Sequence, residues 1–78
     1  MELQERFRRK LREALAARGW TQSEFARQLG MSPATVGDYV LGRTCPGLNI
    51  IEKFEIALEL KRGNLVDDQP LQILQPSA

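Results

Sequence analysis

The segment "TQSEFARQLGMSPATVGDYVLGR", residues 21–43, contains two helix-start signals and two glycine stop signals in close succession. Isolated helices of fewer than ~12 residues are marginal in water, because forming the first turn costs more free energy than it returns. Two helices this short must therefore be stabilised by each other and by the flanking parts of the chain. This requirement limits the chain to folds in which a pair of short helices packs into a helical bundle.

The first short helix is predicted to begin directly after Thr21 and to end at the next glycine. Thr21 and Glu24 form a T-x-x-E capping box, in which each side chain is expected to bond a free backbone N–H. Trp20 and Phe25 have the spacing of a hydrophobic staple across the same cap. The pattern predicts a helix over about 22–29 that buries Phe25, Ala26 and Leu29.

The same signals recur two residues later. Ser32 is the predicted N-cap, and Pro33 takes the first helical position, where its missing N–H is harmless. Met31 and Val36 form a second staple across this cap. The pattern predicts a helix over about 33–41 that ends at Gly42. Its inward-facing side chains are expected to be Val36, Tyr39 and Val40.

Longer amphipathic segments flank this pair. Residues 2–18 carry apolar side chains at three- and four-residue steps, which predicts a helix. Residues 48–61 return to helical spacing, with a core stripe of Leu48, Ile51, Phe54, Ala57 and Leu58, and with Ile56 on the polar side. A further helical turn is expected around Leu65 and Val66, and the tail after it is expected to be extended rather than helical.

The sequence thus predicts an all-α fold: a compact bundle of four to five short helices with a central helix-turn-helix, plus a short extended C-terminal arm. We assign residues 1–66 to the helix-turn-helix domain and residues 67–78 to an arm with a possible role in dimerisation. With 78 residues, 42% apolar and 27% charged, the composition is that of an ordinary small globular protein.

The composition also argues against several functional classes. The chain has no histidine and one cysteine, Cys45, so the commonest general base, the commonest zinc ligand and an intrachain disulfide are all missing. We expect no enzymatic activity, no cofactor, no metal site and no small-molecule substrate. No apolar run approaches the ~20 residues that span a bilayer, and the N-terminus lacks the pattern of a signal peptide, so a cytoplasmic protein is expected.

Charge is unevenly distributed although the formal net charge is only +1. Residues 1–18 hold six basic residues against three acidic ones. Such an end can attract polyanions locally, or it can be a solvated helix face. The sequence leaves both interpretations open.

The combined pattern resembles the lambda-repressor-like (Cro and CI type, or XRE type) DNA-binding domains over residues 3 to about 66. The matching features are Thr21-Gln22, Ala26, Leu29-Gly30, Ser32, Val36, Gly42 and the ladder Pro46, Leu48, Ile51, Phe54 and Leu58. The resemblance implies a helix-turn-helix whose second helix enters the major groove of double-stranded DNA.

Carried onto this chain, the resemblance assigns a phosphate contact to the first residue of the first short helix and base contacts to the start and outer face of the second. The loop that follows corresponds to the family's phosphate-binding segment. The expected DNA-binding residues are Gln22, Pro33, Ala34, Thr35, Asp38, Arg43 and Thr44.

The chain departs from the family pattern at two points. Leu15 and Val40 stand where many relatives have a buried Arg–Glu pair, so a packing contact is expected instead. The expected reading face also has no Gln, Asn, Arg or Lys, the side chains that bond base edges in pairs. Asp38 could accept a hydrogen bond from cytosine or could instead hold Arg43.

We expect a sequence-specific, repressor-like regulator that acts as a homodimer, because a two-fold axis would place two reading helices about 34 Å apart on DNA. A phage Cro-like repressor, an antitoxin-type autoregulator and a restriction-modification controller all fit. The alternative function is a helical adaptor that binds another protein through the same surface. Candidates for the dimer surface, each of which could instead cover the protomer's own core, are Ile56, Leu60, Leu65, Val66, Leu71, Ile73 and Leu74.

Overall fold

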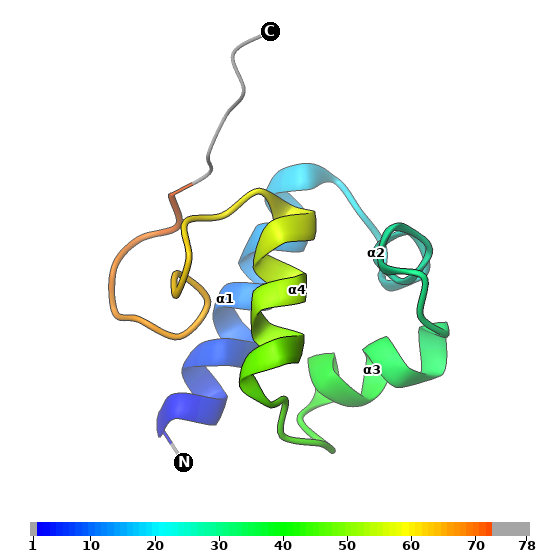
Figure 1. The fold of residues 1–78 in the computed structure, drawn as a ribbon, viewed down its shortest axis with the longest axis horizontal. Coiled ribbons are helices and arrows are strands. Elements are labelled where there is room, and N and C mark those ends of the chain that lie inside the picture. The colour runs from blue at the N-terminus through cyan, green and yellow to red at the C-terminus, as the bar shows by residue number, and fades with distance from the viewer. Residues whose placement is uncertain (1, 73–78) are drawn as a thin grey trace, which may run out of the picture.

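A computed structural model describes residues 2–72, with side chains from residue 4 onward. It contains the helices α1 (Glu2–Arg18), α2 (Gln22–Leu29), α3 (Pro33–Leu41) and α4 (Leu48–Leu58). Helices α1 and α4 pack together, α2 and α3 lie on one side of this pair, and the segment after α4 lies on the other (Figure 1). The predicted all-α fold with a central helix-turn-helix is confirmed. No helix within residues 2–72 is long and apolar enough to span a membrane.

Four aromatic rings join the four helices at the centre of the core. Phe54 of α4 is fully buried and contacts one ring from each of the other three helices. Its ring centroid lies 4.9 Å from that of Phe25 and 5.6 Å from that of Tyr39, both in edge-on geometry, and 6.2 Å from that of Phe7. Such pairs add about 0.5–1.5 kcal/mol each beyond the area they bury. Phe54 therefore fixes α2 and α3 relative to the α1–α4 pair.

The ends of α2 and α3 form as the sequence predicts. Thr21 Oγ1 accepts from the backbone N–H of Glu24 at 3.1 Å, and Ser32 Oγ accepts from that of Thr35 at 3.1 Å. Both helices end at a glycine in the left-handed conformation. One detail of the prediction was wrong: instead of completing the capping box, the Glu24 carboxylate accepts from two side chains of its own helix. These side chains, Gln28 first and then Arg27, lower the pKa of that carboxyl.

Helix α4 ends three residues before the predicted limit of 61. Its C-cap, Glu59, adopts the left-handed conformation at φ 57°, which is unusual for a residue with a side chain. Arg18 of α1 stabilises this end, because its guanidinium donates to the carbonyl oxygen of Leu58 at 3.0 and 3.1 Å and pairs with the Glu59 carboxylate. A positive charge at a helix C-terminus also interacts favourably with the partial negative charge of the helix dipole there.

Leu48 was wrongly assigned to the core. Its side chain is 75% exposed, because the first residue of α4 lies beyond the edge of the aromatic cluster. The buried stripe of the helix is centred on Phe54 and Leu58, with Ile51 and Ala57 partly buried against the core. Ile56 is 76% exposed, in agreement with its predicted place on the polar side.

The basic residues of α1 bind other parts of the chain. Four of the six donate to backbone carbonyls: Arg6 to Val66, Arg8 to Leu41, Lys10 to Asp67 and Gln69, and Arg18 to Leu58. The sequence indicated either a polyanion-attracting end or a solvated face, and it did not indicate these contacts. Much of the positive charge of α1 thus serves to hold α3, α4 and the C-terminal segment.

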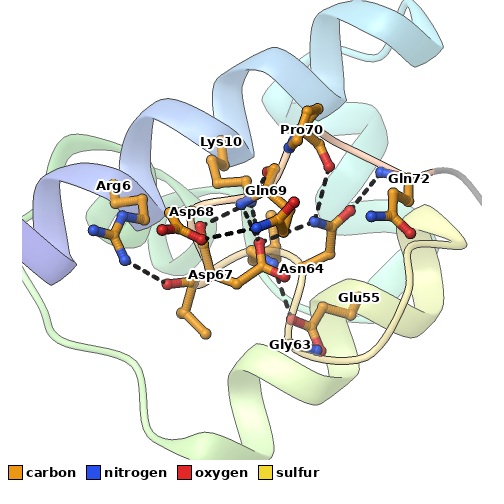
Figure 2. Close-up of polar contacts among 12 residues, drawn as sticks. Arg6, Lys10, Glu55, Gly63, Asn64, Asp67, Asp68, Gln69, Pro70 and Gln72 are labelled. Atoms are coloured by element: carbon orange, nitrogen blue, oxygen red, sulfur yellow. Dashed lines mark hydrogen bonds and ion pairs between the residues drawn. The ribbon is translucent and has the colours of Figure 1, made fainter.

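Residues 61–72 are closed onto α1 by a polar cluster, shown in Figure 2. The ammonium of Lys10, which is 3% exposed, donates to the Asp67 carboxylate at 2.6 Å and to the carbonyl oxygens of Asp67 and Gln69. The amide of Asn64, fully buried, donates to Asp67 Oδ1 and to the Pro70 carbonyl, and it accepts from Gln72 N. The first half of the expected arm, residues 67–72, is non-helical as predicted but packs on the domain. Residues 73–78 lie outside the described residues.

A buried acid holds the turn before this cluster. Glu55 of α4 is 2% exposed, and its carboxylate accepts from the backbone N–H groups of Gly63 and Leu65 at 3.0 and 3.1 Å. The N–H groups of Val66 and Asp67 both bond the Gly63 carbonyl, which forms the helical turn expected around Leu65. The turn therefore depends on a side chain eight residues earlier in the sequence.

Asp67 should make the fold sensitive to acid. Its bond with Lys10 holds the pKa of the Asp67 carboxyl below its usual range. A lowered pKa stabilises the folded state above the unfolded value of about 3.9 and loses that contribution as the pH falls through the folded value. Because it removes the charged partner of the buried Lys10 ammonium, Asp67→Asn should lower the free energy of unfolding at neutral pH by about 1–3 kcal/mol. It should also flatten the decline of that free energy in acid. Denaturant unfolding between pH 7 and pH 2 measures both effects. Asp68→Asn, the same change at an exposed neighbour, is the control, and equal acid profiles for the Asp67 variant and the wild type would contradict the assignment.

Gly42 should be less replaceable than Gly30. Both have positive φ, 79° and 72°, but a Cβ on Gly42 would lie 2.7 Å from Arg8 Cδ, whereas one on Gly30 would meet nothing within 4 Å. Gly30→Ala should cost about 1 kcal/mol of backbone strain. Gly42→Ala should cost about 0.5–1.5 kcal/mol more, because it displaces Arg8 from the Leu41 carbonyl. In an Arg8→Ala background this excess should vanish in a double-mutant cycle of unfolding free energies. An excess of the same size in both backgrounds would show that Arg8 is not its source.

Candidate nucleic-acid interface

Helix α3 divides into an inner and an outer face. Val36 and Val40 are buried in the core, and Tyr39 is partly buried against it. Pro33, Ala34 and Thr35 are exposed at the start of the helix, and Leu41 is 53% exposed at its end. Since α3 lies at the edge of the molecule beside α2 (Figure 1), its outer face is open to a partner.

The seven expected DNA-binding residues lie at or next to this face. Six of them are exposed, and Asp38 is half-buried. They come from the start of α2, from the outer side of α3 and from the loop that follows it. The structure thus places all seven on the surface of one helix-turn-helix unit: Gln22, Pro33, Ala34, Thr35, Asp38, Arg43 and Thr44. Their contact with DNA stays a prediction.

Gln22 lies where α2 approaches α3. Its Oε1 would be 3.3 Å from a Cβ placed on Gly37, so the side chain rests against the backbone of the neighbouring helix. The close approach of the two helices also buries Ala26. A glycine at position 37 therefore leaves room for an amide that reaches from α2 toward the outer face of α3.

Two of the polar side chains on α3 have partners within the protomer. Thr35 Oγ1 lies 2.8 Å from Ser32 Oγ, and either hydroxyl can donate to the other. Asp38 Oδ1 lies 3.7 Å from Arg43 Nη1, which is an ion pair but beyond hydrogen-bond range. An exposed pair of this kind is worth about 0–1 kcal/mol. The arrangement agrees with the interpretation in which Asp38 holds the loop, and it leaves Arg43, with 70% of its side chain exposed, free to reach a phosphate.

Leu15 and Val40, the positions of the family's buried ion pair, are 6% and 4% exposed and belong to the apolar core. Two apolar side chains leave no unpaired charge behind, so this departure is compatible with a stable fold. Arg8, seven residues before Leu15, makes a different link between α1 and α3 through the Leu41 carbonyl. The sequence places Arg8 in a basic run, but it gives no sign that Arg8 bonds the Leu41 carbonyl.

The candidate dimer residues within the described part of the chain separate into three groups by burial. Leu60 and Leu65 are 4% and 0% exposed, so both cover the core of the protomer, and a part for them in a dimer stays a prediction. Val66 and Leu71 are partly buried against the same core. Ile56 is open to solvent. Ile73 and Leu74 lie outside the described residues.

Comparison with known proteins agrees with this geometry. A family model described as "Helix-turn-helix" matches residues 11–63. A segment of 38 residues is 47% identical to an uncharacterized HTH-type transcriptional regulator of Archaeoglobus fulgidus, over 49% of this chain and 17% of that protein. A segment of 45 residues is 36% identical to multiprotein-bridging factor 1 of Schizosaccharomyces pombe, over 58% of this chain and 30% of that protein. No solved structure matches significantly.

The chain therefore spans less than a third of the length of these two relatives. The family model, by contrast, covers more than half of the chain and includes all of α2, α3 and α4. This chain belongs to the lambda-repressor-like (Cro/CI, XRE-type) helix-turn-helix family of DNA-binding domains.

Proposed function

We propose that this protein is a transcriptional regulator that binds double-stranded DNA by placing α3 in the major groove. The observation that carries the proposal is the solvent-exposed outer face of α3, with Gln22 at one side and Arg43 at the following loop. The major groove, about 12 Å wide, admits an α-helix. Membership of the family and similarity to a protein named as an HTH-type transcriptional regulator support the proposal.

The two flanking residues would contact phosphates rather than bases. Gln22 begins α2, where free backbone N–H groups and the helix dipole favour a negative charge. Arg43 adds a guanidinium whose planar donors fit a phosphate. Such contacts set the position of the protein on DNA, whereas base-edge contacts set the sequence.

We further propose that the regulator is repressor-like and binds as a homodimer through the outer face of α4. Ile56 protrudes beside an open groove of about 350 Å³ lined by Glu52, Glu55, Ile56, Leu60 and Arg62. A two-fold axis makes an interface self-complementary, so each Ile56 could enter the groove of the other copy. Occupation of an operator by such a dimer would block access of other proteins to that DNA.

The adaptor function is the second candidate. It is favoured by the scarcity of hydrogen-bond donors on the outer face of α3 and by the similarity to a protein named as a multiprotein-bridging factor. An adaptor would bind its partner without DNA. A fluorescence-anisotropy titration with mixed-sequence duplexes separates the two candidates: binding that weakens steeply between about 50 and 200 mM salt supports the regulator. The absence of binding at the lower salt concentration would reject it.

Replacement of Arg43 should remove one phosphate contact. Arg43→Ala is expected to weaken binding to all duplex sequences and to reduce the slope of log affinity against log salt by about 0.9, the value for one phosphate. Arg9→Ala is the matched control: Arg9 is exposed on α1 next to Asp68, beside the segment after α4, which lies on the other side of the α1–α4 pair from α3 (Figure 1), so it makes the same charge change off the interface. A salt slope that is equally affected by both substitutions would contradict the role of Arg43.

Replacement of Ile56 should weaken the dimer. Ile56→Asp is expected to lower the association constant in sedimentation equilibrium at least tenfold, because it would place two like charges at the two-fold contact. Folding should be unaffected, since the side chain is exposed. Leu48→Asp, at a residue of equal exposure on the same helix, serves as the control. Unchanged association of the Ile56 variant would remove this face from the interface.

A further inference from the structure

The outer face of α3 has an unusual composition for a surface that reads DNA. Its free atoms are mostly hydrocarbon, because the exposed residues of its first turn are Pro33, Ala34 and Thr35 and its last residue is Leu41. The Thr35 hydroxyl is engaged with Ser32, and the Asp38 carboxylate is paired with Arg43. The backbone adds little, since Pro33 has no N–H and the Thr35 N–H bonds Ser32 Oγ.

The apolar positions also fall in line. On a helix with 3.6 residues per turn, Leu41 lies about 20° from Ala34 around the axis and about 10 Å along it. Asp38, between them on the same stripe, points its charge at Arg43. The face thus offers methyl and methylene groups at its two ends, about 10 Å apart along the helix axis.

The rim of this face is positively charged. At the C-terminal end of α3, Arg8 donates to the Leu41 carbonyl, and Arg43, 70% exposed, follows Gly42 in the next loop. A partner that complements an apolar strip beside guanidinium groups carries negative charges along its edge and apolar groups in its middle. Duplex DNA presents this combination wherever a pyrimidine C5-methyl group projects into the major groove between the phosphate chains.

We propose that α3 recognises pyrimidine C5-methyl groups in the major groove, so that its target class is duplex DNA carrying such methyls beneath the two ends of the helix. The inference rests on the proposed DNA-binding function and deepens it. Thymine and 5-methylcytosine both supply this group, whereas cytosine and uracil do not. The selectivity comes from removing methyl surface from water against Ala34, Thr35 and Leu41, and not from hydrogen bonds to base edges.

The expected size of the effect follows from apolar burial. One methyl group buried against hydrocarbon contributes about 0.8 kcal/mol, or about fourfold in affinity. Two such contacts in one half-site would multiply to about fifteenfold, provided that they are independent.

The test uses a duplex selected by the protein from a random pool. Each thymine in turn is replaced by deoxyuridine, which removes the methyl and keeps every Watson–Crick and groove hydrogen-bonding group. We expect about a fourfold loss at thymines under α3 and no loss at thymines outside the footprint. At a sensitive position, a C·G pair should bind less well than T·A, and 5-methylation of that cytosine should restore about fourfold. This second comparison distinguishes a general preference for the methyl group from a requirement for thymine itself.

A protein variant ties the effect to the helix. Leu41→Ala, at an exposed position, should keep the fold and lose the uridine sensitivity at one end of the half-site only. Leu48→Ala, at a residue that is also exposed but lies outside α3, should keep the wild-type pattern. If the wild type binds the selected duplex equally well with thymine and with uridine throughout, the methyl inference is overturned while DNA binding stands. If no duplex is bound at low salt, the proposed function itself fails.

Discussion

The shortness of α2 and α3 is the constraint on which this structure depends. Eight and nine residues do not form stable helices by themselves, so their inner faces must be buried against the rest of the chain. Phe54 meets this need by contacting rings from the other three helices at once. With Val36 and Val40 buried in the core, the opposite side of α3 has to face solvent. The same packing that stabilises the helix therefore exposes the surface that would read DNA.

Helix α1 holds the outer parts of the molecule through its basic side chains. These side chains donate to backbone carbonyls of α3, of α4 and of the segment after α4. Hydrogen bonds from charged donors are stronger than neutral ones, and each such bond satisfies a carbonyl at a point where a helix or turn ends. Residues 61–72 have little regular structure, so the contacts of Lys10, Glu55 and Asn64 take the place of a helix or strand in fixing their path.

The proposed interface separates affinity from selectivity. Phosphate contacts from Gln22 and Arg43 would act on any sequence, while an apolar helix face would discriminate only modestly at each position. A homodimer would apply that modest discrimination twice, which is one reason why the oligomeric state matters for this protein more than for a regulator with many base-edge hydrogen bonds. The protein-binding alternative uses the same exposed face but needs no phosphate contact, so the two functions differ most clearly in their response to salt.

The sequence alone determined the bounds of α2 and α3, because a capping residue, a proline and a left-handed glycine act within a few residues of one another. It also determined the outward position of Ile56, since helical periodicity follows from local spacing, whereas the candidate set around α3 is what the family resemblance implies. Tertiary structure decided the end of α4, where Arg18 stabilises a left-handed Glu59 from 41 residues away. It likewise decided the burial of Lys10, the inward position of Leu60 and Leu65, and the exposure of Leu48. Each of these depends on partners distant in sequence, and residue spacing carries no information about such partners.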